Sequence, residues 1–154
     1  MSTLRSRVKI NAPPERVWPF VADPVLESTW NPKMVAIDRD REGTVSLGER
    51  FQIEYVMSGR SSRCEAEVLV SDAPTRLVYR YHLLGENKPV SVLMTYDLRR
   101  TGDSTRLVQT VDMSGVGIPL PVRALIWFIT RFGRSVGAEY LETLRAEVER
   151  LDTT

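Results

Sequence analysis

The C-terminal segment from Pro119 to Leu151 constrains the fold most, because it contains no proline after Pro121. In its second half, apolar residues recur at three- and four-residue spacing, which is typical of one face of an amphipathic helix. They are Val136, Tyr140, Leu144, Val148 and Leu151, and the opposite face carries Glu139, Glu142, Arg145, Glu149 and Arg150. A long C-terminal helix is therefore predicted, with one face buried and the other in solvent.

Two glycines, Gly133 and Gly137, project onto the apolar face of this predicted helix, together with Ile126 and Ile129. A glycine inside a helix costs about 1 kcal/mol relative to alanine. We therefore expect the two glycines to face something that comes close to the helix. Either a strand backbone or a bound molecule would meet that expectation.

The front half of the same segment has a second apolar group, formed by Leu125, Phe128 and Phe132, on the side that is polar further along. A bend near Gly133, or cover from other helices, would explain it, and the short apolar window favours this interpretation. The alternative is an exposed apolar patch that contacts a membrane, a carrier protein or a second copy of the chain. A homodimer through these three residues is the partner interface that the alternative predicts.

Composition excludes several classes of protein. The 154 residues are 42% hydrophobic and 27% charged, which is typical of one globular domain spanning residues 1–154. Lys+Arg 21 against Asp+Glu 20 leaves a net charge of +1, which argues against a nucleic-acid partner. Cys64 is the only cysteine, so no internal disulfide is expected. The most apolar window, Ala124 to Ile129, is too short to span a bilayer, and the N-terminus lacks a signal-peptide pattern. We expect a cytoplasmic protein.

Seven segments alternate between apolar and polar residues, as half-buried strands do. They are Leu4–Asn11, Met34–Arg39, Gly48–Met57, Ser62–Val70, Arg76–Leu83, Val90–Leu98 and the column from Leu107 to Met113. Between the first two, Arg16–Ala22 and Val25–Trp30 are predicted as short helices, and Pro19 should kink or shorten the first. This order predicts an α+β fold with a curved antiparallel sheet wrapped around the C-terminal helix.

The chain resembles the START-like, or helix-grip (SRPBCC), superfamily, in its polyketide cyclase/dehydrase and lipid-transport branch. The residues that carry the resemblance are Val8–Ile10, Ala12-Pro13, Glu15, Val17-Trp18, Asp23-Pro24, Trp30-Asn31-Pro32, Gly48, Phe51 and Gly102–Thr105 before Leu107. Pro19 departs from the usual pattern, which concerns the course of the first helix. The resemblance implies a deep cavity between sheet and long helix that takes hydrophobic small molecules. Fold alone does not select a function within this superfamily.

The side chains expected to face this interior form the candidate binding site. They are Phe51, Ile53, Tyr55, Tyr79, Tyr81, Met94, Tyr96, Gln109 and Met113 from the strands, and Ile129, Gly133, Gly137 and Tyr140 from the helix. No carboxylate, lysine, arginine or histidine falls in register on the inward columns of the strands. Because general acid–base catalysis needs a group that titrates near neutrality, the pattern favours binding over catalysis, and no catalytic residue is assigned.

Several single residues have two interpretations. The inward tyrosine hydroxyls would either contact a ligand or bond to solvent or to the helix. Gln109 needs a partner, and a ligand oxygen, a water or a protein group would serve. Cys64 is expected to be a small core residue, and His82 is expected on the outer face beside Arg80. One histidine and one cysteine do not make a metal site without carboxylates at matching positions, so neither metal nor cofactor is expected.

The favoured function is binding, or transport, of a hydrophobic small molecule such as a lipid, an isoprenoid or a polyketide. The alternative is a polyketide aromatase/cyclase or dehydratase, in which the cavity would mainly fold the substrate. Tyr79, Tyr81 and Tyr96 would then be hydrogen-bond donors. In a third hypothesis the cavity is filled, and the apolar front half of the helix docks a partner.

Overall fold

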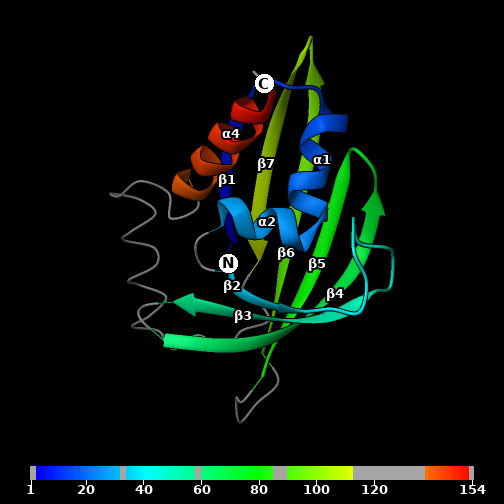
Figure 1. Ribbon diagram of the computed structural model, residues 1–154, viewed down its shortest axis with the longest axis vertical. Helices are drawn as coiled ribbons and strands as arrows, with labels where there is room; N and C mark the ends of the chain where they lie inside the picture. Colours follow the sequence, from blue (N-terminus) through cyan, green and yellow to red (C-terminus); the bar gives the residue numbers. More distant parts are fainter. Residues whose placement is uncertain (1–2, 32–33, 58–59, 85–89, 113–137, 153–154) are drawn as a thin grey trace.

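The computed structural model describes residues 3–31, 34–57, 60–84, 90–112 and 138–152 (Figure 1). The helices and strands, in chain order, are β1 (Thr3–Ile10), α1 (Pro14–Ala22), α2 (Pro24–Trp30), β2 (Met34–Asp38), β3 (Arg50–Met57), β4 (Arg60–Asp72), β5 (Arg76–Leu83), β6 (Val90–Thr101), β7 (Ser104–Asp112) and α4 (Ala138–Asp152). The predicted α+β class is confirmed, with all seven strands and both short helices at the expected places.

All seven strands form one antiparallel sheet in the order β1-β7-β6-β5-β4-β3-β2. Each strand from β2 to β7 pairs with the next one along the chain, and the last strand, β7, also pairs with the first, β1. The sheet is strongly curved, since β2 and β3 run across the view in Figure 1 while β1, β7, β6 and β5 run along it. A register shift between Val68 and Val70 of β4 lies within this curve, as expected of a bulge that bends its strand.

The helices α1, α2 and α4 of the described residues lie on one face of the sheet, which we call the inner face (Figure 1). The alternation along the strands decides which residues point there, because successive side chains of a strand point to opposite faces. Fully buried residues come from every layer: Ile10, Leu77 and Leu107 from the sheet, Val17 and Val21 from α1, and Leu141, Leu144 and Val148 from α4. This is the sheet-around-helix packing that the sequence predicted.

Helix α1 is longer than expected at its start, and it is not cut short at Pro19. It begins at Pro14, where a proline loses no helical hydrogen bond, and continues through Pro19 to Ala22. The side chain of Asp23 then caps α2, because its Oδ1 accepts a hydrogen bond from the Val25 N–H at 3.0 Å. The indole N–H of Trp30, at the end of α2, donates to the Phe20 carbonyl at 2.7 Å and holds the two helices together.

Helix α4 packs chiefly on β1 and also contacts α1 and α2. Leu144 and Val148 are buried as predicted, and Leu141, which the predicted face omitted, is buried with them. The Asn11 N–H donates to Glu149 Oε1 at 2.9 Å, tying the end of β1 to α4. No helix within the described ranges is long and apolar enough to cross a membrane.

Other predictions for the C-terminal helix fall outside the described residues. This applies to the site residues Met113, Ile129, Gly133 and Gly137, to the helix positions Ile126 and Val136, to the apolar group Leu125, Phe128 and Phe132, and to the side chains of Tyr140 and Leu151. The homodimer through the apolar group therefore stays a prediction.

Candidate functional site

A buried carboxyl group lies at the centre of the described interior, between α2 and the inner face of the sheet. Glu27 belongs to α2 and is only 3% exposed. Its carboxyl group has hydrogen bonds with the side chain of Asn31, at the end of the same helix, and with the hydroxyl of Tyr96 on β6. We call these three residues, together with Gln109, the Glu27 network.

Burial determines the charge of this carboxyl group. Removal from water raises the pKa of Glu27 from 4.5 to about 8, although the hydrogen bonds with Asn31 and Tyr96 act in the opposite direction. No cationic side chain is among the causes of this shift. Glu27 is thus largely protonated at neutral pH and can exchange a proton near neutrality, a property often found at functional sites.

Gln109 of β7 connects the sheet to the network. Its Nε2 donates to the Tyr96 hydroxyl at 3.1 Å and lies 3.6 Å from the sulfur of Met94. Since that hydroxyl accepts from Gln109, its own proton is available to the carboxyl group of Glu27. A protein group, one of the three partners that the sequence allowed, thus contacts this amide. The amide, phenol and carboxyl groups form a continuous polar path from β7 to α2.

The aromatic side chains of β3 and β5 form a second group beside this path. The rings of Tyr79 and Tyr81 lie 5.5 Å apart, and the Phe51 ring meets Tyr79 edge-on at 6.3 Å, a favourable arrangement for aromatic pairs. The Tyr79 hydroxyl donates to the Val21 carbonyl of α1 at 3.3 Å. Burial raises the pKa of both tyrosines well above the ordinary value, so they stay neutral hydrogen-bonding groups.

A charged pair closes the end of the interior next to this aromatic group. Arg39 donates from Nε to Glu49 Oε2 at 2.5 Å and from Nη2 to Glu49 Oε1 at 3.1 Å. Its guanidinium lies 5.8 Å from the centre of the Phe51 ring, close enough for a cation–π contact. Both side chains are nearly hidden, at 3% and 9% exposure. The polar groups of the interior are thus neutral around Glu27, whereas at Arg39 the positive charge is balanced by the carboxylate of Glu49.

The structure brings many of the predicted site residues together. Phe51, Ile53, Tyr79, Tyr81, Tyr96 and Gln109 are buried, and Tyr55 and Met94 are partly buried against the same core. The hydroxyls of Tyr79 and Tyr96 bond to α1 and α2 rather than to the C-terminal helix that the sequence suggested. Within the described residues, contact of these side chains with a ligand remains a prediction.

Two other single residues lie where the sequence placed them. Cys64 is buried, and burial, with a smaller contribution from Glu27, raises the pKa of its thiol to about 12, which makes it an inert core residue. His82 is half-exposed on the outer face, with Nε2 3.6 Å from Glu67 Oε1. Among the described side chains, no group of three or more histidine, cysteine or carboxylate residues could hold a metal ion.

Sequence reasoning missed Glu27, Arg39 and Glu49, because it looked for ionisable groups only on the inward columns of the strands. Glu27 lies on a helix. Arg39 and Glu49 flank a loop whose sequence is typical of a solvent-exposed, charged turn. A signal existed for Glu27: Pro24, Glu27 and Trp30 recur at three-residue spacing and share one face of α2, which is buried. For Arg39 and Glu49, the ten-residue separation carries no periodic signal.

Comparison with known proteins identifies a family. A family model described as polyketide cyclase / dehydrase and lipid transport matches residues 1–149. No curated protein matches this chain.

Solved structures share the fold. A protein of Chromobacterium violaceum is 22% identical, with a TM-score of 0.69 and coverage of 96% of both chains. A protein of Mesorhizobium loti is 20% identical, with a TM-score of 0.70 and coverage of 96% of this chain and 97% of that chain. A protein from the dynemicin biosynthetic locus is 19% identical, with a TM-score of 0.65, and the match covers 97% of this chain and 48% of that one. At these identities the likeness shows the fold alone.

Proposed function

Because the chain belongs to the polyketide cyclase/dehydrase and lipid-transport family, we propose that it binds a hydrophobic small molecule between the inner face of the sheet and the C-terminal helix. A lipid, an isoprenoid or a polyketide belongs to this class. The observation that carries the proposal is the Glu27 network, a connected set of neutral polar groups in a largely apolar interior. Binding sites for small molecules combine apolar walls with a few such groups.

The chemistry of the interior indicates which ligands suit it. Glu27, protonated at neutral pH, has a proton to donate, and the Tyr96 oxygen, which accepts from Gln109 and bonds to Glu27, has a second lone pair to accept with. An anionic head group would gain no cation here, since Arg39 is already paired with Glu49. We therefore propose a mostly hydrocarbon ligand that carries an uncharged oxygen, such as an alcohol, a ketone or an ester.

The proposed site takes its walls from the residues expected from the sequence. Among the described residues, the strands supply Phe51, Ile53, Tyr55, Tyr79, Tyr81, Met94, Tyr96 and Gln109. Met113, Ile129, Gly133, Gly137 and Tyr140 stay expectations from the sequence. The Glu27 network adds Glu27 and Asn31 as its polar end. Native mass spectrometry of the protein as purified from cells tests the proposal directly, since a retained molecule would identify the ligand class.

A titration with two probes tests the polar end. A fluorescent fatty alcohol should bind more tightly at pH 7 than the fatty acid of equal length, whose carboxylate is left unpaired. Tyr96→Phe should weaken binding of the alcohol roughly threefold to tenfold, as expected for one neutral hydrogen bond. Asp103→Asn, in the exposed turn between β6 and β7, is the control. Equal binding of both probes, or an effect of the control as large as that of Tyr96→Phe, would contradict the proposal.

One observation favours a second function, a cyclase or dehydratase acting on a polyketide chain. A carboxyl group with a pKa of about 8 can serve as a general acid and base near neutrality. Glu27 would then exchange a proton with the substrate, and Tyr96 would hold the substrate oxygen. Incubation with a short poly-β-ketone thioester distinguishes the two functions. Turnover that has a bell-shaped pH profile and is lost in Glu27→Gln would establish the enzyme, whereas binding without turnover would support the carrier.

A further inference from the structure

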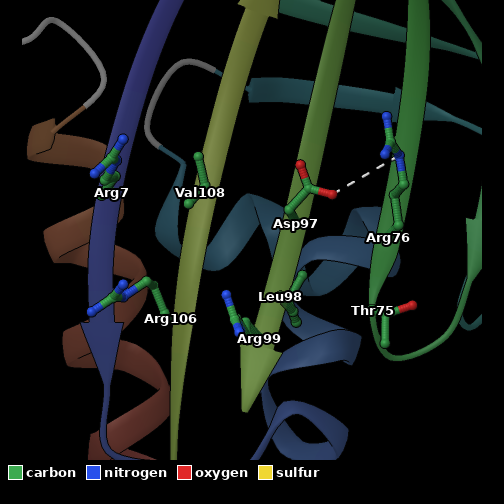
Figure 2. Close-up of a pocket in the computed structure, with 8 residues that line it drawn as sticks. All are labelled: Arg7, Thr75, Arg76, Asp97, Leu98, Arg99, Arg106 and Val108. Atoms are coloured by element: carbon green, nitrogen blue, oxygen red, sulfur yellow. Dashed lines mark ion pairs between the residues drawn. The ribbon is translucent and has the colours of Figure 1, made fainter. Parts of the chain in front are cut away.

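The outer face of the sheet, opposite the helices, has a depression that the proposed function does not use. It measures about 580 Å³ and lies across β1, β7, β6 and β5. Figure 2 shows the side chains around it: Arg7 from β1, Arg106 and Val108 from β7, Asp97 and Arg99 from β6, and Arg76 from β5. We call this depression the arginine cleft. Its volume lies within the range of small-molecule sites, roughly 300–1,000 Å³.

The register of the sheet concentrates positive charge at one end of the arginine cleft. Lys9 lies directly opposite Arg106, and Arg106 lies directly opposite Arg99, so three cations form a row across β1, β7 and β6. Arg7, two residues before Lys9, points to the same face. Like charges directly opposite one another destabilise a sheet. The net charge of +1 gave no indication of this local cluster.

Several arginines elsewhere on the sheet have carboxylate partners. Arg50 and Arg80 face Glu67, and Arg100 pairs with Glu15. In the arginine cleft, the one ion pair joins Arg76 to Asp97 at 3.9 Å. Within the part of the chain that the structure describes, no ion pair neutralises Arg7, Arg99 or Arg106. Three unneutralised arginines thus line one depression.

We propose that the arginine cleft binds the phosphoryl group of a small molecule, held by Arg7, Arg99 and Arg106. A phosphate monoester carries between one and two negative charges and three acceptor oxygens, so it can accept paired hydrogen bonds from more than one guanidinium. A carboxylate has one charge and two oxygens, and one arginine already satisfies it. The phosphoryl group lies on the β1–β7–β6 side, away from Asp97, where Arg76 is already engaged.

The arginine cleft is independent of the proposed ligand site. Successive side chains of a strand point to opposite faces of the sheet, so the two sites use different side chains of the same strands. On β6, Tyr96 belongs to the inner face and Asp97 to the cleft; on β7, Gln109 belongs to the inner face and Val108 to the cleft. The sheet itself separates the two ligands. Loss of one binding activity therefore leaves the other intact.

Isothermal titration with inorganic pyrophosphate at low salt tests the proposal. The triple variant Arg7→Gln/Arg99→Gln/Arg106→Gln should weaken binding at least tenfold. The matched control, Arg41→Gln/Arg50→Gln/Arg145→Gln, removes the same net charge from exposed arginines that pair with carboxylates outside the cleft. It should change the affinity less than threefold. Because the cleft variant relieves like-charge contacts, its melting temperature should not fall below that of the wild type, which confirms that it folds.

Two further binding measurements identify the kind of molecule that carries the phosphoryl group. Co-sedimentation with vesicles of phosphatidylglycerol and phosphatidylcholine, compared with phosphatidylcholine alone, detects binding to a lipid head group. Arginine-dependent binding to the anionic vesicles supports the phosphoryl site and assigns it to a membrane lipid, and binding of pyrophosphate without vesicles assigns it to a free metabolite. Absence of binding to both probes, equal losses in the two triple variants, or much tighter arginine-dependent binding of a 20-base-pair DNA duplex would overturn the proposal.

Discussion

Glu27 and Glu49 are two nearly buried carboxyl groups of one domain, and their pKa values are shifted in opposite directions. The pKa of Glu27 is raised to about 8 by removal from water. The pKa of Glu49 is lowered, first by its hydrogen bonds with Arg39, although burial acts against this. The comparison teaches that burial alone does not determine the charge of a carboxyl group here. What determines it is whether the fold supplies a cation within hydrogen-bonding distance.

The two positions acquire their partners in different ways. Glu49 precedes β3, and Arg39 follows β2, so the pairing of these two strands brings both ends of the loop together. Glu27 projects from α2 toward β6, where the groups it meets, Tyr96 and Asn31, are neutral. The fold thus places a fixed, compensated pair at one end of the interior and a titratable group at its centre.

The pH dependence of stability should show the state of Glu27. Its folded pKa lies above the unfolded value of 4.5, so between pH 4.5 and 8 the folded state holds a proton that the unfolded state has lost. The contribution of Glu27 to stability is therefore fully present below the unfolded pKa and is lost as pH rises toward 8. At about 1.36 kcal/mol per pKa unit, and allowing for relaxation around the charge, we expect a loss of about 2–4 kcal/mol between pH 5 and pH 8.

Urea denaturation at several pH values, with the Glu27→Gln variant, measures this loss. Glutamine keeps the size and the hydrogen bonding of the protonated side chain but has no proton to lose, so the variant should have a much flatter profile. Glu142→Gln, on the exposed face of α4, is the control and should follow the wild type. A wild type as flat as Glu27→Gln would show that Glu27 is ionised or solvated in the folded protein.

Removal of the Arg39 guanidinium should leave Glu49, like Glu27, as a buried carboxyl group without a cationic partner. Arg39→Met leaves a nearly hidden carboxylate without its partner, which costs about 2 kcal/mol; fully buried pairs lose about 3–5 kcal/mol. The pKa of Glu49 should then rise, so the deficit should shrink when the pH is lowered toward 5. The double variant Arg39→Met/Glu49→Gln should recover part of the loss in a double-mutant cycle. Additive losses would mean that the pair does not interact in solution.

Tyr96→Phe tests how far hydrogen bonds substitute for a cation. The hydroxyl of Tyr96 bonds to Glu27 and accepts from Gln109, so its removal should cost about 1–2 kcal/mol. The Tyr96 bond holds the pKa of Glu27 down, and that pKa should therefore rise further in the variant. Carboxyl carbon chemical shifts, followed against pH in protein labelled at glutamate, report this directly. Tyr79→Phe, which removes only the 3.3 Å bond to Val21, should leave the titration of Glu27 closer to the wild type.

The fold could be predicted from the sequence, because period-two alternation and helical spacing are local signals that repeat along each element. Within the described residues, the predicted strands and short helices are confirmed, with ends that shift by a few residues. The alternation also placed Tyr79, Tyr96 and Gln109 on the inner face, where the structure has them.

The partners of these residues could not be predicted in the same way. Whether Gln109 meets a ligand or Tyr96, and whether Glu27 meets water or the sheet, depends on how α2 docks onto β6. The row Lys9, Arg106 and Arg99 likewise depends on the pairing of β1 with β7, which joins the two ends of the sheet order. Contacts between distant segments leave no periodic trace in the sequence.

The smallest effect is expected at His82, where a carboxylate has cations around it but lies on the outer face. Glu67 accepts from Arg50 at 3.0 Å and lies within 3.7 Å of Arg80 and His82, and the pKa of Glu67 is lowered, chiefly by Arg50. Exposed ion pairs contribute little, because water and salt screen them. His82→Ala should therefore change the melting temperature by less than about 2 °C.

The His82→Ala variant should also leave binding of the fatty-alcohol probe unchanged, since the sheet separates His82 from the interior. In 1 M salt its effect should disappear, whereas the flattening caused by Glu27→Gln, which arises in the interior, should persist. Loss of probe binding in His82→Ala would place the ligand on the outer face and contradict the assignment of the inner face as the binding site.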